Sequence, residues 1–187
     1  NVFEAYEPLW RVASKILEPS KSPRSANINL IISSEWNFSP FVFSGLWSSP
    51  VLKDFILIGL PASEAANPLL IPLAGHELGH IVWKKHALRK TVEGQVKTLL
   101  TELLKPKGDN VQLSLFDTAE YPEMTELALR QAEETFCDLF GLRLFRQSYI
   151  YAFFYLLFPW RESYTAAGYT YPPIVERINM LLQASKI

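Results

Sequence analysis

Two histidines and a glutamate lie close together in the sequence, at a spacing that suits metal chemistry. The segment His76-Glu77-Leu78-Gly79-His80 contains two of the three histidines of the chain. In an α-helix, residues four apart lie on one face, so both imidazoles can reach one metal ion. Glu77 lies one residue further round, where its carboxylate can contact a water molecule beside that ion. The segment therefore predicts a zinc site that activates water for attack on a carbonyl group.

A catalytic zinc site takes three protein ligands and keeps one position open, so the two histidines need a partner. One candidate is His86, which follows His80 at the spacing of the longer H-E-x-x-H-x-x-G-x-x-H motif. That motif has a glycine where the chain turns back, and Trp83 occupies this position here. The pair Lys84-Lys85 before His86 is typical of the solvated end of a helix. We therefore expect His86 to lie at the surface.

The other candidates lie downstream, in the segment that begins at Glu133. Glu134 and Asp138 are four residues apart in a predicted helix, so both lie on one face. A glutamate ligand followed by an aspartate can supply a zinc ligand and an acceptor for the N–H of a ligating histidine. We favour Glu134 as the third ligand and Asp138 as that acceptor, and Glu133 stays open as an alternative. Cys137 is interpreted as a small buried apolar residue.

Together these residues resemble a known group of enzymes. H-E-L-G-H, followed about fifty residues later by E-x-x-x-D, is similar to the gluzincin metallopeptidases, and in particular to the family of the CAAX prenyl-protein peptidases and their soluble bacterial relatives. Residues 171–178, Y-P-P-I-V-E-R-I, resemble the late H-P-P-x-x-x-R-I segment of that family, with Tyr171 in place of the histidine. The resemblance implies catalytic roles for Tyr171 and Arg177, which can both donate to a developing oxyanion.

The resemblance also implies a fold and a reaction. We expect a zincin-like domain that binds Zn(II) and hydrolyses peptide bonds of a protein or peptide substrate, with Glu77 as general base. The apolar segment 55–60 is then either the edge strand along which an extended peptide lies or a fully paired interior strand. The alternative function is a non-cleaving zincin-fold module with a binding or regulatory role.

Apolar periodicity and turn residues divide the rest of the chain into elements. We expect an α+β fold with a small sheet first and mostly helix afterwards, as one domain over residues 1–187 that a longer chain could contain. The predicted strands are 27–33, 38–43 and 55–60, with a further short strand at 111–116. The predicted helices are 2–17, 67–83, 91–104, 122–147, 149–158 and 173–184, and the aromatic residues of 149–158 are expected in the core.

Composition narrows the classes of partner. The chain has 18 basic and 19 acidic residues and a net charge of −1, which argues against nucleic-acid binding through a basic surface. The longest apolar run, 149–160, falls short of the ~20 residues needed to span a bilayer. One cysteine cannot form an internal disulfide. Since the first residues also do not form a signal-peptide pattern, we expect a cytoplasmic protein without a membrane span.

Overall fold

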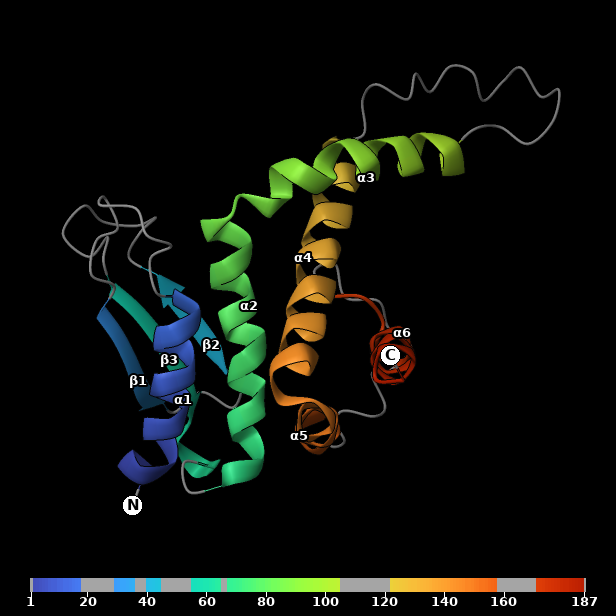
Figure 1. The fold of residues 1–187 in the computed structure, drawn as a ribbon. Coiled ribbons are helices and arrows are strands. Elements are labelled where there is room, and N and C mark those ends of the chain that lie inside the picture. The colour runs from blue at the N-terminus through green and yellow to red at the C-terminus, as the bar shows by residue number, and fades with distance from the viewer. Residues whose placement is uncertain are drawn as a thin grey trace, which may run out of the picture.

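The structure is a computed structural model that describes residues 2–17, 29–35, 40–44, 55–64, 67–104, 122–157 and 171–186. The described part is α+β and mostly helical, as expected (Figure 1). The predicted strand 111–116 lies outside the described residues. In chain order the elements are α1 (Val2–Leu17), β1 (Asn29–Glu35), β2 (Phe41–Ser44), β3 (Phe55–Pro61), η2 (Ala62–Glu64), η3 (Pro68–Leu73), α2 (Ala74–Lys85), α3 (Leu88–Leu104), α4 (Pro122–Phe145), α5 (Gln147–Leu157) and α6 (Ile174–Ala184).

The three strands form one sheet in the order β1-β3-β2. β3 pairs in parallel with β1 and antiparallel with β2, so it is the central strand. The alternative prediction that residues 55–60 form an edge strand is therefore wrong. An edge strand has one unpaired side, but β3 is paired with β1 on one side and with β2 on the other. Within the described sheet, β2 is the edge strand that lies nearest α2.

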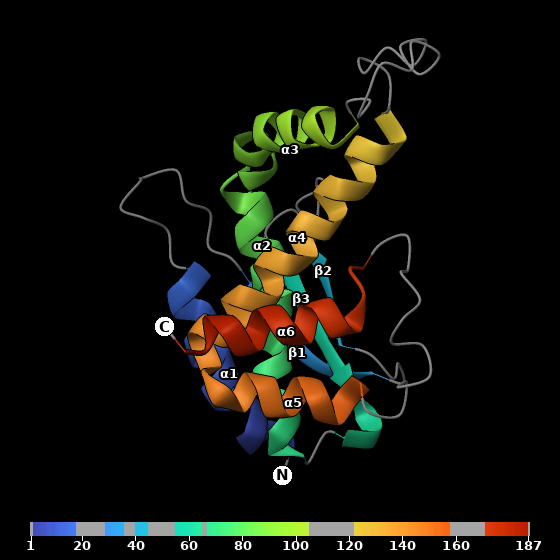
Figure 2. The same ribbon diagram turned by 90° about the vertical axis from the view of Figure 1, so that its right-hand side faces the viewer.

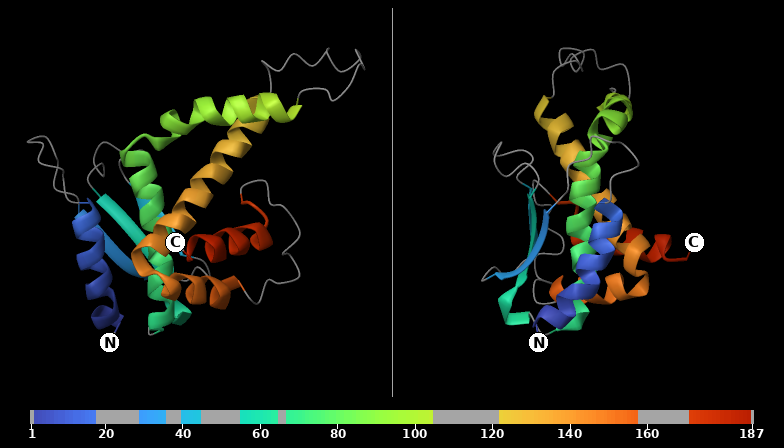
Figure 3. Two further views of the ribbon diagram at one scale, coloured as in Figure 1. Left: turned by 45° about the vertical axis from the view of Figure 1, so that its right-hand side comes forward. Right: turned by 60° about the vertical axis from the view of Figure 1, so that its left-hand side comes forward.

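Helices α1 and α2 cover one face of this sheet (Figure 3). Alternate side chains of β3 point towards the helices, as the period of two in a strand requires. They join the apolar faces of α1 and α2 in one core, made of Leu9, Ala13, Leu17, Ile56, Ile58, Leu60, Ala74, Leu78 and Ile81.

The segment before α2 differs from its prediction as a continuous helix. Asn67 caps it as expected, since its Oδ1 accepts a hydrogen bond from the backbone N–H of Leu69 at 3.0 Å. The residues that follow form the 3-10 helix η3, and the α-helix begins only at Ala74. Pro72 explains the difference because it has no N–H for an α-helical hydrogen bond. The histidine segment 76–80 therefore lies in the first half of α2, close to its start.

Helices α2 and α4 pack against each other in antiparallel directions. A Cβ atom at Gly75 would lie 2.9 Å from the Cα of Gly141, and a Cβ at Gly79 would lie 2.8 Å from the Cα of Cys137. Only glycine permits these approaches, because real Cβ atoms do not come this close to backbone. The contact places the face of α2 that carries both histidines opposite the middle of α4.

A second core lies on the other side of α4, where α5 and α6 pack (Figure 2). Tyr149 and Phe153 are buried there, as expected, but Tyr151, Phe154 and Tyr155 are exposed on the outer face of α5. The described aromatic residues of the predicted segment 149–158 are thus only partly core, since a single helix at the surface can bury only one of its faces. Phe158 lies outside the described residues.

The remaining helices follow their predictions with shifted boundaries. α2 ends at a turn in which Ala87 has a positive φ of 49°, and α3 starts at Leu88, three residues earlier than predicted. The far half of α3 leaves Leu99 and Leu103 exposed. None of the helices in the described ranges is both long and apolar enough to cross a membrane.

The close approach of α2 and α4 predicts a cost for the smallest side-chain addition. We expect Gly79→Ala to lower the free energy of unfolding by about 1–3 kcal/mol, because the methyl group meets backbone. The control Gly94→Ala, at an open position of α3, should raise that free energy by up to ~1 kcal/mol through helix propensity. Urea denaturation of both variants measures the difference, and equal stability would contradict the packing of α2 on α4.

Candidate metal centre

The two histidines of α2 lie side by side with their rings facing α4. The centroids of the His76 and His80 rings are 5.0 Å apart and the ring planes are nearly perpendicular. Both side chains are mostly buried, with 13% and 17% of their surface exposed. The spacing in the sequence therefore does bring both imidazoles to one place, as helical geometry requires.

A carboxylate of α4 holds the Nδ1 atom of each histidine. Nδ1 of His76 is 2.9 Å from Oδ1 of Asp138, and Nδ1 of His80 is 2.8 Å from Oε1 of Glu133. A carboxylate accepts hydrogen bonds, so each Nδ1 carries a proton and donates it. Nε2 is then the nitrogen of each ring that is left to bind a metal ion, which is the arrangement of metal-ligating histidines.

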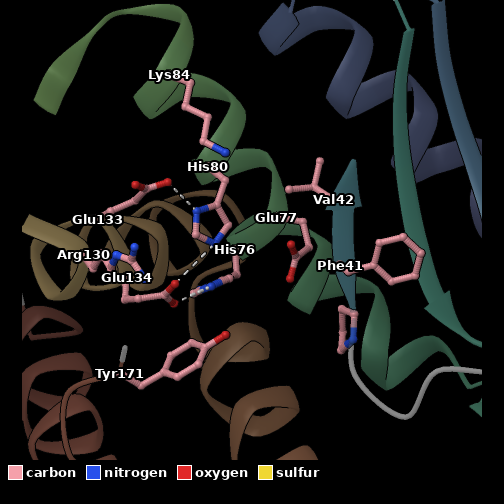
Figure 4. A pocket seen from close by; sticks show the side chains of 11 residues that line it. Phe41, Val42, His76, Glu77, His80, Lys84, Arg130, Glu133, Glu134 and Tyr171 are labelled. Atoms are coloured by element: carbon pink, nitrogen blue, oxygen red, sulfur yellow. Dashed lines mark hydrogen bonds and ion pairs between the residues drawn. The ribbon is translucent and has the colours of Figure 1, made fainter. Parts of the chain in front are cut away.

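The Nε2 atoms converge on Glu134 (Figure 4). Nε2 of His76 is 3.1 Å from Oε2 of Glu134, and Nε2 of His80 is 3.7 Å from Oε1. Despite the short contact, Oε2 is buried and has no hydrogen bond with good geometry. Ligands about 2.0–2.1 Å from a tetrahedral zinc ion lie about 3.3–3.4 Å apart. The separation between Nε2 of His76 and Oε2 of Glu134 is close to this value.

Asp138 behind His76 is the most strongly held group of the site. Its carboxylate is fully buried and accepts hydrogen bonds from Nε and Nη2 of Arg177 at 2.7 and 2.8 Å, and from the hydroxyl of Tyr149 at 2.8 Å. Burial alone would raise the pKa of Asp138, but the bonds from His76 and Arg177 outweigh it and lower the pKa to about 2. Asp138 is therefore ionised and fixed at neutral pH.

The same carboxylates act on the basicity of His76. Burial alone lowers the pKa of His76, but the contacts with Asp138 and Glu134 outweigh it and raise the pKa to about 9. The imidazole is thus protonated at neutral pH in the metal-free protein. A metal ion at Nε2 would have to displace that proton, so metal affinity would rise with pH up to that value.

Arg177 lies behind the site and not in its cavity. Its guanidinium is bound to Asp138, with the rings of Phe153 and Tyr171 at 4.9 and 5.4 Å from Cζ. This position differs from the expected donation to an oxyanion, since the Asp138 carboxylate binds Nε and one Nη of Arg177. Arg177 thus contacts Asp138, which in turn contacts His76.

Glu77 lies on the opposite side of the histidines, between α2 and β2 (Figure 4). It is buried, and this burial raises the pKa of its carboxyl group, with a further rise from Glu134 and an opposing effect of the two histidines. A carboxylate with a raised pKa is a better proton acceptor, as a general base requires.

These groups surround a cavity of about 350 Å³ that is open to solvent. Tyr171 lies at the His76 side of it with its hydroxyl towards Glu134 and the histidines (Figure 4). The lining residues are Pro40, Phe41, Val42, His76, Glu77, His80, Lys84, Arg130, Glu133, Glu134 and Tyr171.

Cys137 provides a second possible set of metal ligands. Ligand atoms of His76, His80 and Cys137 lie within 4.8 Å of one another. However, Cys137 is fully buried against Gly79 and does not line the cavity. Burial raises the pKa of its thiol far above the usual value, with nearby carboxylates adding to the rise, and only the thiolate is a good ligand. Glu134, in contrast, lines the cavity, and its Oε2 lies 3.1 Å from Nε2 of His76.

The structure brings most of the expected residues together, in roles that differ in part. His86 is exposed at the C-terminal end of α2 and outside the cavity, and Trp83 packs on Phe136 with ring centroids 5.3 Å apart. Sequence reasoning considered Glu133 only as a ligand and missed its contact with His80. It also missed the hydroxyl of Tyr149, although a buried tyrosine on an apolar helix generally needs a polar partner.

Comparison of the chain with models of protein families, with curated proteins and with solved structures gave no match.

The two donor sets make opposite predictions for metal binding. We expect Glu134→Ala to lower zinc affinity by more than about 100-fold, since mutation of residues behind a ligand already costs about 10–100-fold. Cys137→Ser, a nearly isosteric change, should leave the affinity within a few-fold of the wild type. Competition with a chromogenic chelator measures both. The reverse result, with zinc lost in Cys137→Ser and kept in Glu134→Ala, would assign the site to the cysteine.

Proposed function

We propose that this chain is a zinc-dependent peptidase with a zincin-like fold, in which His76, His80 and Glu134 hold one Zn(II). The observation that carries the proposal is that Nε2 of His76 lies 3.1 Å from the buried, unbonded Oε2 of Glu134 and Nε2 of His80 lies 3.7 Å from Oε1 of the same carboxylate. Two nitrogen donors and one oxygen donor are a common ligand set of catalytic zinc, and they leave one position towards the cavity. A bound zinc ion would supply a Lewis acid that polarises a carbonyl group and makes water more acidic.

Glu77 is the general base in this proposal. Its carboxylate accepts a proton from the attacking water and passes it to the amine that leaves when the peptide bond breaks. Because burial has already removed much of the water around Glu77, its ionised form is destabilised and gains by taking up the proton.

Tyr171 is the proposed donor to the oxyanion. It lines the same cavity as Glu77, and burial together with nearby acids raises the pKa of its hydroxyl, so it stays protonated and can donate. Arg177 is a positioning residue that keeps Asp138 on His76 and supports the ring of Tyr171.

The substrate backbone has a place beside the metal site. Pro40, Phe41 and Val42 at the start of β2 line the cavity on the Glu77 side. β2 pairs with β3 along one side, and its other side is unpaired within the described sheet. An extended peptide can add to such an edge through main-chain hydrogen bonds, which would align its carbonyl groups with the histidines.

The role of Glu77 predicts a separation of metal binding from catalysis. Glu77→Gln should keep about one zinc ion per chain while cleavage of a peptide library falls by at least about 10²–10⁴-fold, because the amide cannot accept the proton. His76→Ala should lose zinc, and Glu123→Gln at the exposed start of α4 is the control. Mass spectrometry of the digested library and metal analysis give both readouts. Zinc retained in His76→Ala would refute the site, and wild type that binds zinc without cleaving the library would favour the non-cleaving module.

The role of Tyr171 predicts a change in kcat. Tyr171→Phe removes only the hydroxyl, so we expect kcat to fall by about 10²–10³-fold with little change in KM or in zinc content. Tyr151→Phe, at an exposed position of α5, should have wild-type kinetics. Steady-state kinetics on any peptide found in the library measures both variants, and an unchanged kcat in Tyr171→Phe would remove this residue from the mechanism.

A further inference from the structure

We propose that Tyr149 is a positioning residue of the metal site, because its hydroxyl holds Asp138 in the orientation that keeps Nε2 of His76 turned towards Glu134. This inference rests on the proposed zinc site and adds a residue of α5 to it. Tyr149 is not among the residues that line the cavity, so it would act on a metal ion only through Asp138 and His76.

The turn between α4 and α5 brings Tyr149 back to Asp138, which precedes it by 11 residues. α4 ends at Phe145, and Arg146 has a φ of 54°, a left-handed conformation that is uncommon for residues other than glycine. The N–H of Arg146 donates to the carbonyl of Leu142 at 2.8 Å, and the N–H of Tyr149 donates to the carbonyl of Arg146 at 3.0 Å. These bonds close the turn, so the start of α5 lies against the end of α4 (Figure 2).

Gly141 makes room for the ring of Tyr149 on α4. A Cβ atom at position 141 would overlap with this ring. The ring also packs against Phe153, with ring centroids 6.0 Å apart, and Tyr149 is fully buried. Packing therefore fixes the ring on α4, and its hydroxyl reaches Asp138, which lies about one helical turn before Gly141.

The hydroxyl of Tyr149 lies beside the hydrogen bond that orients His76. It donates to Oδ1 of Asp138 at 2.8 Å, and it lies 3.5 Å from Nδ1 of His76, which donates to the same oxygen at 2.9 Å. Arg177 donates to Oδ1 through Nη2 and to Oδ2 through Nε. Asp138 is thus held from α5 as well as from α6. Without the hydroxyl, only Arg177 would hold it from behind within the described part of the chain.

The hydroxyl could have either of two opposite effects on a metal ion at His76. By orienting Asp138 it favours metal binding, since groups behind a ligating histidine are worth about 10–100-fold in affinity. By competing with His76 for Oδ1 it would weaken the hydrogen bond behind the ring. The bond from His76 keeps an ordinary length of 2.9 Å with the hydroxyl in place. The hydroxyl therefore adds to the hold on Asp138 without displacing His76.

Tyr149→Phe tests the inference because it removes only the hydroxyl. We expect zinc affinity to fall about ten-fold in competition with a chromogenic chelator, at the lower end of the range for residues behind a ligand. The d–d absorption of the cobalt-loaded protein should also shift, because the ring of His76 is held less firmly. Tyr151→Phe, the same change at an exposed position of the same helix, should match the wild type in both measurements.

Stability measurements separate positioning from a purely structural role. Loss of a buried hydrogen bond lowers the free energy of unfolding, but this does not alter zinc affinity while nearly all chains remain folded. Urea denaturation of the metal-free variants gives the folded fraction. Wild-type zinc affinity or a wild-type cobalt spectrum in Tyr149→Phe would overturn the inference. Tighter zinc binding would overturn it too, because the hydroxyl would then weaken the bond between Asp138 and His76.

The wild-type chain offers a second readout, which decides the question if Tyr149→Phe does not fold. The buried hydroxyl proton of Tyr149 should exchange slowly with water and give its own NMR signal, assigned through the contact of its ring with Phe153. Zinc should shift this signal, because the hydroxyl shares Oδ1 of Asp138 with His76. A signal that is absent or does not respond to zinc would overturn the inference.

The outcomes separate this inference from the function on which it rests. If Tyr149→Phe binds zinc as tightly as the wild type does, the role of Tyr149 is wrong and the peptidase proposal stands. If the wild type binds no zinc, both fail. A wild type that binds zinc but cleaves no peptide would contradict the peptidase function alone, because the affinities measure the role of Tyr149 without any cleavage.

Discussion

The close contact between α2 and α4 is the constraint on which the site depends. Gly75 and Gly79 leave no side chain between the two helices, so the backbones approach until the contacts at Gly141 and Cys137 stop them. At this separation two carboxylates of α4 reach the imidazole of His76, Asp138 at Nδ1 and Glu134 at Nε2. A wider spacing would leave Glu134 short of the histidines, and the proposed zinc site would lose its third ligand.

The second requirement is that the buried charge of Asp138 be stabilised, and side chains from three helices do this. α2 supplies His76, α5 supplies Tyr149 and α6 supplies Arg177, so one carboxylate links the histidine helix to the C-terminal half of the chain. Removing one partner of a buried ion pair costs about 3–5 kcal/mol, because the other charge stays buried. The stability of this half and the orientation of His76 therefore depend on the same hydrogen bonds.

Features that depend on local spacing could be predicted from the sequence, whereas features that depend on tertiary packing could not. The pairing of His76 with His80, and of Glu134 with Asp138, follows from helical spacing within single elements. Whether Glu133 or Glu134 faces the histidines depends on the rotation of α4 about its axis, and the structure shows that they contact different nitrogens. The central place of β3 depends on pairing with β2 across a connection that local patterns do not determine. Likewise, Arg177 follows two prolines in sequence, but only packing of α6 on α4 places it on Asp138.

The two histidines are held in unequal ways, and this has a functional consequence. Asp138 behind His76 is fully buried and bound by Arg177 and Tyr149, so the ring on that side has one position. Glu133 behind His80 has 21% of its side chain exposed and lines the cavity. A group that enters the cavity at this end meets the partner of His80 directly, whereas no ligand can reach Asp138 without opening the core. In the proposed enzyme, His76 would therefore be the ligand with a fixed environment, and His80 the ligand whose environment a substrate could change.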